Sequence, residues 1–250
     1  ALELWHGPTC AFKDYALQLM PRLLVEAKKT LGRTETTRIL VATSGDTGKA
    51  ALAGYAGLDG IEIQVFYPNA GTSEIQRLQM VTQEGENVQV YAVDGNFDDA
   101  QTGVKRVFAD ASVGAELEKR NIRLSSANSI NWGRLVPQIV YYFHAYFRLV
   151  EQGAAAWGQP VDFCVPTGNF GDILAGYYAK RMGLPVGKLV CASNRNNVLT
   201  DFIRTGTYDA RREFYKTSSP SMDILISSNL ERLLYHVSGS SGKVSAWMRE

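Results

Sequence analysis

Short apolar runs alternate with longer segments of helical periodicity along almost the whole chain, and this alternation limits the possible fold more than any other feature. Parallel strands that are buried on both faces and joined by crossover helices produce this pattern. The sequence therefore predicts an α/β fold with parallel sheets. Strands are expected at residues 38–42, 62–67, 88–93, 161–165 and 188–192, and helices at residues 15–28, 49–56, 72–83, 97–111, 134–151 and 172–182.

Composition and charge narrow the class of partner. The formal net charge is +1 and 45% of the 250 residues are hydrophobic, so nothing favours nucleic acid or an anionic membrane surface as a partner. The longest apolar stretch, 135–150, is interrupted by a proline and by polar residues, which predicts a buried or amphipathic helix rather than a membrane span. The 3 cysteines lack the spacing of metal ligands, so we expect reduced thiols, a cytoplasmic location and no metal site.

A lysine near the start of the chain is a candidate covalent catalyst. Lys13 follows the Gly7-Pro8 turn, stands beside Asp14 and precedes the expected helix 15–28. The ordinary pKa of a lysine is about 10.4, and a partly buried position lowers it because desolvation disfavours the ammonium. A neutral amine can then trap a carbonyl compound as an imine. The alternative is a solvated lysine at a helix start.

Two loops that join a strand to a helix have the composition of anion-binding turns. Residues 42–49 (Ala-Thr-Ser-Gly-Asp-Thr-Gly-Lys) contain the hydroxyl donors Thr43, Ser44 and Thr47, and residues 166–172 read Pro-Thr-Gly-Asn-Phe-Gly-Asp. Free backbone N–H groups and the dipole of the following helix favour an anion at such turns. The first loop lacks the spacing of a Walker A motif. Each loop alone could be an ordinary turn with a helix cap, but together with Lys13 they predict two anion sites near a reactive amine.

These segments resemble the motifs of threonine synthases, which are pyridoxal-phosphate (PLP) enzymes of fold type II. The resemblance runs through residues 6–14 (His-Gly-Pro-Thr-Cys-Ala-Phe-Lys-Asp), 42–48, 126–134 (Ser-Ala-Asn-Ser-Ile-Asn-Trp-Gly-Arg) and 166–172, in that order, and covers essentially the whole chain. It implies the architecture of the tryptophan synthase β family. It also implies further sequence on both sides, so we expect the central portion of a longer enzyme, incomplete at both ends.

The resemblance assigns the cofactor site to four positions in one loop and two elsewhere. It implies that Lys13 binds pyridoxal 5'-phosphate covalently and later moves protons, and that Asp46 lies beside the cofactor ring. The residues expected to hold the cofactor phosphate are Gly168, Asn169, Phe170 and Gly171.

The substrate that the resemblance implies is O-phosphohomoserine. Its phosphate is expected to be held by Ser44, Thr47, Asn128, Ser129 and Arg134. A guanidinium can pair with two phosphate oxygens in a planar fork, which suits Arg134 to this task. The alternative for Arg134 is a surface ion pair at the start of the helix 134–151.

The implied activity is that of a PLP-dependent lyase in threonine biosynthesis. Phosphate leaves Cγ of O-phosphohomoserine, water adds at Cβ, and L-threonine is released. Three alternatives stay open. The first is β-replacement or dehydration on the same fold, which does not need the residues 128–134. The second is a threonine synthase-like phospho-lyase that makes 2-oxobutyrate, and the third is a non-catalytic fragment that binds phosphorylated ligands or merely folds.

The family resemblance also implies a division into domains. Residues 38–149 are expected to form a small α/β domain, and residues 1–37 and 150–250 are expected to belong to a large PLP-binding domain. The sequence makes no prediction of the oligomeric state.

Overall fold

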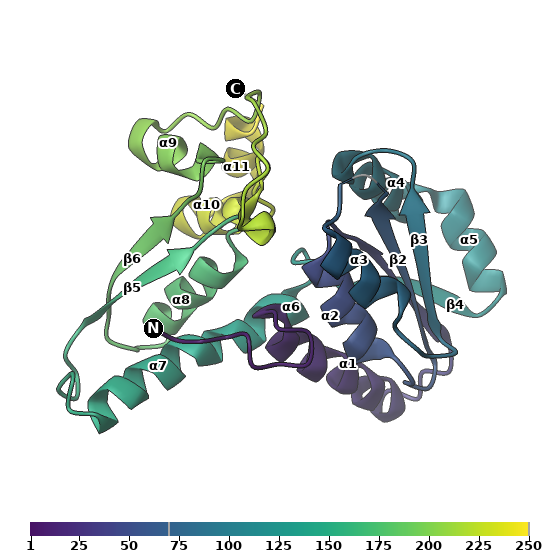
Figure 1. The fold of residues 1–250 in the computed structure, drawn as a ribbon, viewed down its shortest axis with the longest axis horizontal. Coiled ribbons are helices and arrows are strands. Elements are labelled where there is room, and N and C mark those ends of the chain that lie inside the picture. Colours follow the sequence, from purple (N-terminus) through teal and green to yellow (C-terminus); the bar gives the residue numbers. More distant parts are fainter. Residues whose placement is uncertain (70, 250) are drawn as a thin grey trace. The chain divides into compact units, whose positions relative to one another are not determined.

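The computed structural model describes residues 1–69 and 71–249, except for the side chain of Asp98. Backbone contacts divide the chain into two compact units, Ala1–Arg134 and Leu135–Glu250, and each unit is described by itself (Figure 1). The expected large and small domains, with boundaries after residues 37 and 149, refer to the architecture of complete relatives and stay a prediction.

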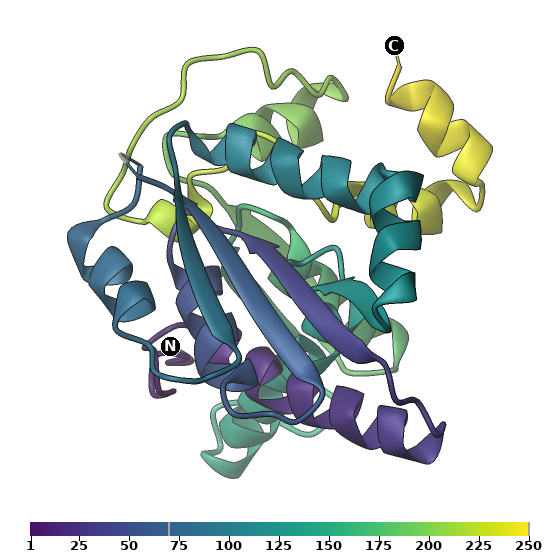
Figure 2. The same cartoon turned by 90° about the vertical axis from the view of Figure 1, so that its right-hand side faces the viewer.

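The first unit is built on a four-stranded parallel sheet, which confirms the predicted α/β fold. The strand order is β3-β2-β1-β4, and every neighbouring pair is parallel. Figure 2 shows this sheet from its broad side. Its strands are β1 (Thr36–Ala42), β2 (Ile61–Pro68), β3 (Val88–Val93) and β4 (Ile122–Ser126).

Helices cover both faces of this sheet because side chains alternate between the faces along each strand. Ile39 and Val41 of β1 lie in a core cluster with residues of α1 (Lys13–Thr30), α2 (Asp46–Tyr55) and α3 (Glu74–Val81). The intervening Leu40 and Ala42 pack instead with α4 (Phe97–Ala109) on the opposite face. The result is a three-layer unit in which the carboxyl ends of β1 and β4 lie side by side.

Two elements of the first unit were not predicted. β4 escapes a search for apolar runs because it is only 5 residues long and its arginine and serines interrupt the apolar pattern. The expected helix 97–111 is wrong at its end, because α4 stops at Ala109 and a second helix, α5 (Ala111–Lys119), follows. The Asp110 side chain accepts hydrogen bonds from the backbone N–H groups of Ser112 and Val113, which fixes the start of α5.

The single helix expected at 134–151 is also wrong. The chain instead forms a short helix α6 (Trp132–Leu135), a 3₁₀ turn η1 (Val136–Gln138) and then α7 (Ile139–Glu151). Pro137 lies in the 3₁₀ turn, where the missing N–H of a proline is tolerated. The proline thereby separates the residues 128–134 from the aromatic helix α7.

The second unit contains the parallel strand pair β5 (Val161–Pro166) and β6 (Val186–Ala192), joined by α8 (Gly171–Arg181). Tyr142 of α7 lies edge-on to Phe163 of β5, with ring centroids 5.1 Å apart. The chain then continues through α9 (Val198–Thr205), η2 (Pro220–Met222), α10 (Leu230–Ser238) and α11 (Ser241–Trp247). Within the described part of the chain, no helix combines the length and apolarity needed to cross a membrane.

Candidate active site

Lys13 is the first residue of α1 and is 8% exposed. Its Nζ donates to Oδ2 of Asp46 at 2.5 Å, and Asp46 is the first residue of α2, directly after the turn that follows β1. Burial lowers the pKa of Lys13 below its ordinary value, although the Asp46 carboxylate opposes this and the Arg134 charge adds to it. Lys13 is therefore not a solvated lysine at a helix start. It is a buried amine held at one carboxylate.

The loop before Lys13 is organised by the neighbouring carboxylate. Asp14 is 1% exposed and accepts hydrogen bonds from the Thr9 N–H (2.9 Å), the Thr9 hydroxyl (2.5 Å) and the Ala11 N–H (3.3 Å). The Asp14 carboxylate lies so close to Gly7 that a Cβ on that glycine would come within 2.5 Å of its oxygen. Residues 7–12, which we call the lysine loop, are thus wrapped around Asp14, and this fixes where α1 and Lys13 begin.

The turn after β1 holds its own shape through a threonine. The Thr43 hydroxyl oxygen accepts hydrogen bonds from the Gly45 and Gly48 N–H groups at 2.9 and 3.0 Å, so both of its lone pairs are used within the turn. Thr43 is buried, whereas Ser44 and Thr47 are partly exposed. Among the described residues, no hydrogen bond joins the hydroxyl of Ser44 or Thr47 to a protein partner. Two of the three expected hydroxyls are thus available to a ligand.

The turn after β4 lies against the end of β1. The Asn128 side-chain amide donates to the Ala42 carbonyl at 2.9 Å, because β4 and β1 are neighbours in the sheet. Ser129 follows in the same turn and is partly exposed. The structure therefore brings four of the predicted residues, Ser44, Thr47, Asn128 and Ser129, onto adjacent turns at the carboxyl edge of one sheet.

Arg134 is 2% exposed, so it is not part of a surface ion pair. Its Nη1 donates to the Ala127 carbonyl at 2.7 Å, which ties the guanidinium to the turn that carries Asn128 and Ser129. The guanidinium charge also acts on the pKa of Lys13 and lowers the pKa of the buried Tyr55 hydroxyl, although burial raises the latter overall. Arg134 is a buried cation within electrostatic range of the Lys13 amine.

The second predicted loop follows β5 in the second unit. Phe170 adopts the left-handed conformation (φ 64°) and α8 begins at the next residue. Within the described residues, the backbone N–H groups of Gly168, Asn169, Phe170 and Gly171 donate to no protein acceptor. Successive N–H groups that no described protein acceptor uses, at a helix N-terminus, have the arrangement that can bind an anion. We call residues 168–171 the glycine loop.

Sequence reasoning missed the residues that contact the glycine loop. The Ser227 hydroxyl donates to the Gly168 carbonyl at 2.5 Å, and both the backbone and the side-chain N–H of Asn229 donate to the Asn169 carbonyl. The only available signal was the Ser-Ser-Asn run before a helical pattern, which predicts a helix start and nothing more. Among the described residues, no cluster of His, Cys, Asp and Glu could hold a metal ion.

A model of one protein family, described as "Pyridoxal-phosphate dependent enzyme", matches residues 2–245. The chain belongs to this family. Pyridoxal 5'-phosphate is therefore its cofactor, and its fold is that of the fold type II enzymes.

Known relatives of the chain include threonine synthases. It is 49% identical to the threonine synthase of Pseudomonas aeruginosa over 247 residues (98% of this chain and 50% of the relative). It is also 49% identical to threonine synthase-like 1 of Homo sapiens over 250 residues (97% of this chain and 33% of the relative). The crystal structure of PLP-bound threonine synthase from Brucella melitensis matches with a TM-score of 0.85 and 45% identity (99% of this chain and 51% of that one). The chain thus spans about a third to a half of these proteins.

The residues present fit the cofactor of the family. A phosphate needs several donors, and the glycine loop offers a run of N–H groups that no described protein acceptor uses. An aldehyde needs a neutral amine, and burial favours that form of Lys13. The two requirements are met in separate units of the chain.

Proposed function

We propose that this chain carries the catalytic residues of a threonine synthase, which converts O-phosphohomoserine and water to L-threonine and phosphate. The observation that carries the proposal is the pair of the buried Lys13 with Asp46. Next to this pair, two turns bear hydroxyl and amide groups, and Arg134 is buried. The identity of about half to threonine synthases supports it. The reaction balances without a further reactant, since the Cγ–O bond breaks, a Cβ–O bond to water forms and protons move between the two carbons.

In this proposal, Lys13 Nζ holds the aldehyde carbon of the cofactor and the N–H groups of Gly168–Gly171 hold its phosphate. The cofactor supplies an electron sink for the bonds at Cα. Asp46 fixes the position of Nζ through its hydrogen bond, and its carboxylate counteracts part of the burial effect on the pKa of Lys13. We assign Asp46 to a position beside the cofactor ring.

Lys13 also moves protons in the proposed reaction. Once the amino group of the substrate had displaced Nζ from the aldehyde carbon, the free neutral amine of Lys13 would remove the proton from Cα of the substrate and a proton from Cβ, and would return a proton at Cγ. A base for such work must be neutral at the operating pH, and the burial of Lys13 favours this. Because Lys13 begins a helix whose first turn is fixed by Asp14, its backbone needs little rearrangement between these steps.

The phosphate of the substrate is assigned to Ser44, Thr47, Asn128, Ser129 and Arg134. Ser44 and Thr47 offer hydroxyl donors, and Arg134 offers a charge in a buried environment, where its attraction to phosphate is stronger than in water. This site distinguishes the proposed reaction from β-replacement or dehydration, whose substrates carry no γ-phosphate. It does not distinguish threonine synthase from a phospho-lyase that makes 2-oxobutyrate, because both would use the same residues.

Product analysis tests the proposal. We expect the protein, given pyridoxal phosphate and O-phosphohomoserine, to release inorganic phosphate and L-threonine in equal amounts. Formation of 2-oxobutyrate in place of threonine would assign the phospho-lyase reaction. If neither threonine nor 2-oxobutyrate is formed, the protein does not catalyse either reaction of this substrate.

A pair of arginine variants tests the substrate-phosphate assignment. Arg134→Ala is expected to weaken the binding of O-phosphohomoserine by about 2–5 kcal/mol, because the charge partner of a buried phosphate is lost. Arg38→Ala is the matched control, since Arg38 lies on β1 and pairs with Glu62 at the surface. Equal substrate affinities in the two variants would remove Arg134 from the site.

A further inference from the structure

The glycine loop of the second unit is held from a distant part of the chain. Ser227 and Asn229 lie 59 and 60 residues beyond the carbonyls that they bind. The Asn229 N–H and side-chain amide donate to the Asn169 carbonyl at 3.1 and 3.0 Å, and the Ser227 hydroxyl donates to the Gly168 carbonyl at 2.5 Å. Asn229 is 0% exposed and Ser227 is 8% exposed. The Ser227 hydrogen bond is buried and the Asn229 side-chain hydrogen bond is part-buried, and such bonds contribute strongly when a buried partner would otherwise be left unsatisfied.

The same segment also packs against the loop sterically. A Cβ added at Gly168 would lie 3.0 Å from a side-chain carbon of Ile224 and 3.1 Å from the Cα of Met222. A side chain at this position would therefore require its neighbours to shift by a few tenths of an ångström. The loop therefore has little freedom to move toward residues 222–224.

This segment is anchored in turn to the end of β6. The Asp223 carboxylate accepts hydrogen bonds from the Asn194 and Asn196 side chains at 2.7 and 3.0 Å, and both asparagines follow β6 directly. The Tyr208 hydroxyl binds the segment as well, because it accepts from the Ser227 N–H at 2.7 Å. Residues 217–229, which we call the strap, thus connect the end of β6 with the turn after β5.

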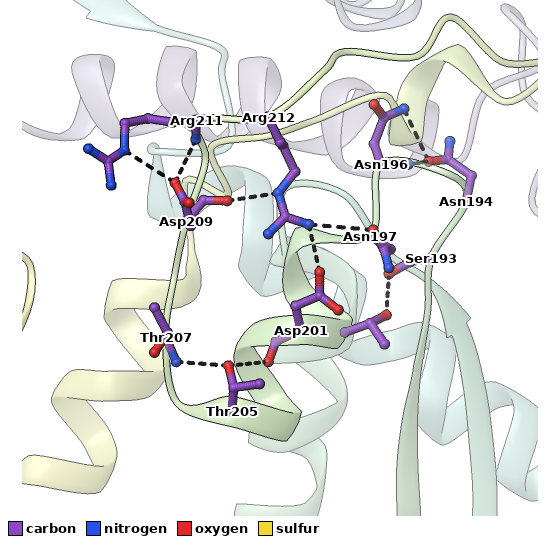
Figure 3. Close-up of polar contacts among 11 residues, drawn as sticks. Ser193, Asn194, Asn196, Asn197, Asp201, Thr205, Thr207, Asp209, Arg211 and Arg212 are labelled. Atoms are coloured by element: carbon purple, nitrogen blue, oxygen red, sulfur yellow. Dashed lines mark hydrogen bonds and ion pairs between the residues drawn. The ribbon is translucent and has the colours of Figure 1, made fainter.

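The chain that leads into the strap is fixed by a further polar cluster (Figure 3). Arg212 donates to the Asp201 carboxylate of α9 at 2.7 Å and to the Asp209 carbonyl at 2.8 Å. Asn194 and Asn196 lie in the same view, joined by a hydrogen bond between the Asn196 amide and the Asn194 oxygen. The chain that precedes the strap is consequently held by several hydrogen bonds.

We propose that the strap positions the glycine loop for the cofactor phosphate, with Ser227 and Asn229 as positioning residues. This rests on the assignment of the glycine loop to the phosphate. Each hydrogen bond from the strap binds a carbonyl oxygen of the loop, and a carbonyl that is held in place fixes the plane of its peptide. The N–H of the same peptide is thereby directed away from the strap, where it can serve a ligand. We assign neither residue a direct contact with the phosphate.

A comparison of two ligands separates this role from general stability. Pyridoxal carries the same aldehyde as pyridoxal phosphate but lacks the phosphate, so the ratio of the two dissociation constants measures the phosphate site alone. We expect Asn229→Ala to reduce the preference of the protein for pyridoxal phosphate over pyridoxal by about tenfold, and Ser227→Ala by a smaller factor. The dissociation constants are measured by absorbance titration, and the folded state is checked by circular dichroism.

Asn87→Ala is the matched control. The Asn87 side chain also ties backbone segments together, with its amide donating to the Tyr55 and Ile61 carbonyls at 2.9 and 3.1 Å, but it lies in the first unit. This variant is expected to lose stability and to keep the full preference for the phosphorylated ligand.

The outcomes decide the proposal in either direction. An unchanged preference in both strap variants would overturn it, and so would a wild-type protein that binds the two ligands equally well. If Asn229→Ala does not fold, Ser227→Ala decides alone, since it removes only a hydroxyl. A wild-type protein that makes no threonine but shows a preference that Ser227→Ala weakens would disprove the proposed reaction and support the role of the strap.

Discussion

The lysine loop and the glycine loop are both held by buried polar side chains, but over very different distances along the chain. Asp14 binds backbone and hydroxyl groups only 3 to 5 residues away. The glycine loop depends on Ser227 and Asn229, which are 59 and 60 residues away. One loop is thus organised by its own sequence neighbours, and the other by the tertiary fold of the second unit.

The two loops are therefore expected to form at different stages of folding. Closing a short loop costs little conformational entropy, so the lysine loop can form together with the first turn of α1. The glycine loop acquires its shape only after β5, β6 and the strap have come together. Damage to the fold of the second unit is therefore expected to remove phosphate binding while the environment of Lys13 is retained.

The largest effect is expected from Lys13→Ala, which removes the amine and leaves both loops intact. No covalent adduct with pyridoxal phosphate is then expected, because no other described lysine is as deeply buried beside a carboxylate. The mass of the protein after borohydride reduction measures the adduct. Persistence of the adduct at full yield would show that another amine binds the cofactor and that the lysine loop does not carry the reactive lysine.

Asp14→Ala tests the local anchor. The variant leaves the Thr9 and Ala11 N–H groups and the Thr9 hydroxyl without their acceptor, and we expect a loss of about 2–4 kcal/mol in the free energy of unfolding. Urea denaturation measures the change. Asp14→Asn keeps one acceptor oxygen and should lose less, whereas Asp59→Ala, at an exposed position, should change little. A loss as small as that of Asp59→Ala would show that the lysine loop holds its shape without the carboxylate.

Two alanine substitutions test the close packing of the glycine loop on the strap. At Gly168 the new Cβ meets atoms at 3.0–3.3 Å, two of them in the backbone of the strap, so Gly168→Ala should cost about 1–3 kcal/mol of stability. At Gly171 the nearest atom is the Asn229 amide nitrogen at 3.5 Å, an ordinary contact. Gly171→Ala is therefore expected to be nearly as stable as the wild type. Equal thermal stability of the two variants would argue against a rigid strap.

The smallest effect concerns pH. Burial raises the pKa of Asp172, in the first turn of α8, from its ordinary value of 3.8 to about 6, and the hydrogen bond from Tyr142 counteracts this only in part. The folded state thus holds a proton that the unfolded state has already released, so this contribution to stability is lost as the pH rises from about 4 to 6. After allowance for the partial exposure of the side chain, the change is about 1–2 kcal/mol.

Asp172→Asn removes this titration. We expect the difference in unfolding free energy between the variant and the wild type to increase in favour of the variant between pH 4 and 7. Urea titrations at a series of pH values measure it. If the difference in unfolding free energy did not change with pH, the pKa of Asp172 would not be raised in the folded protein. No group at the start of α8 would then titrate in this range.

Much of the fold followed from periodicity. The strands β1, β2, β3, β5 and β6 lie within two residues of their predicted bounds, because buried parallel strands form apolar runs that local composition reveals. The errors came where a local signal was weak or was overridden. β4 was too short and too polar to detect, and Pro137 divided a segment whose apolar pattern continues on both sides.

For the candidate site, the sequence alone predicted which segments would carry chemistry, since glycine-rich turns after strands and a lysine before a helix are local patterns. The tertiary structure alone decided that Lys13 faces Asp46, that Arg134 is buried and that Asn229 holds the glycine loop. The physical reason is distance along the chain. Residues 33 or 60 positions apart meet only when strands pair and helices pack. The composition of one segment does not indicate which distant residue it will contact.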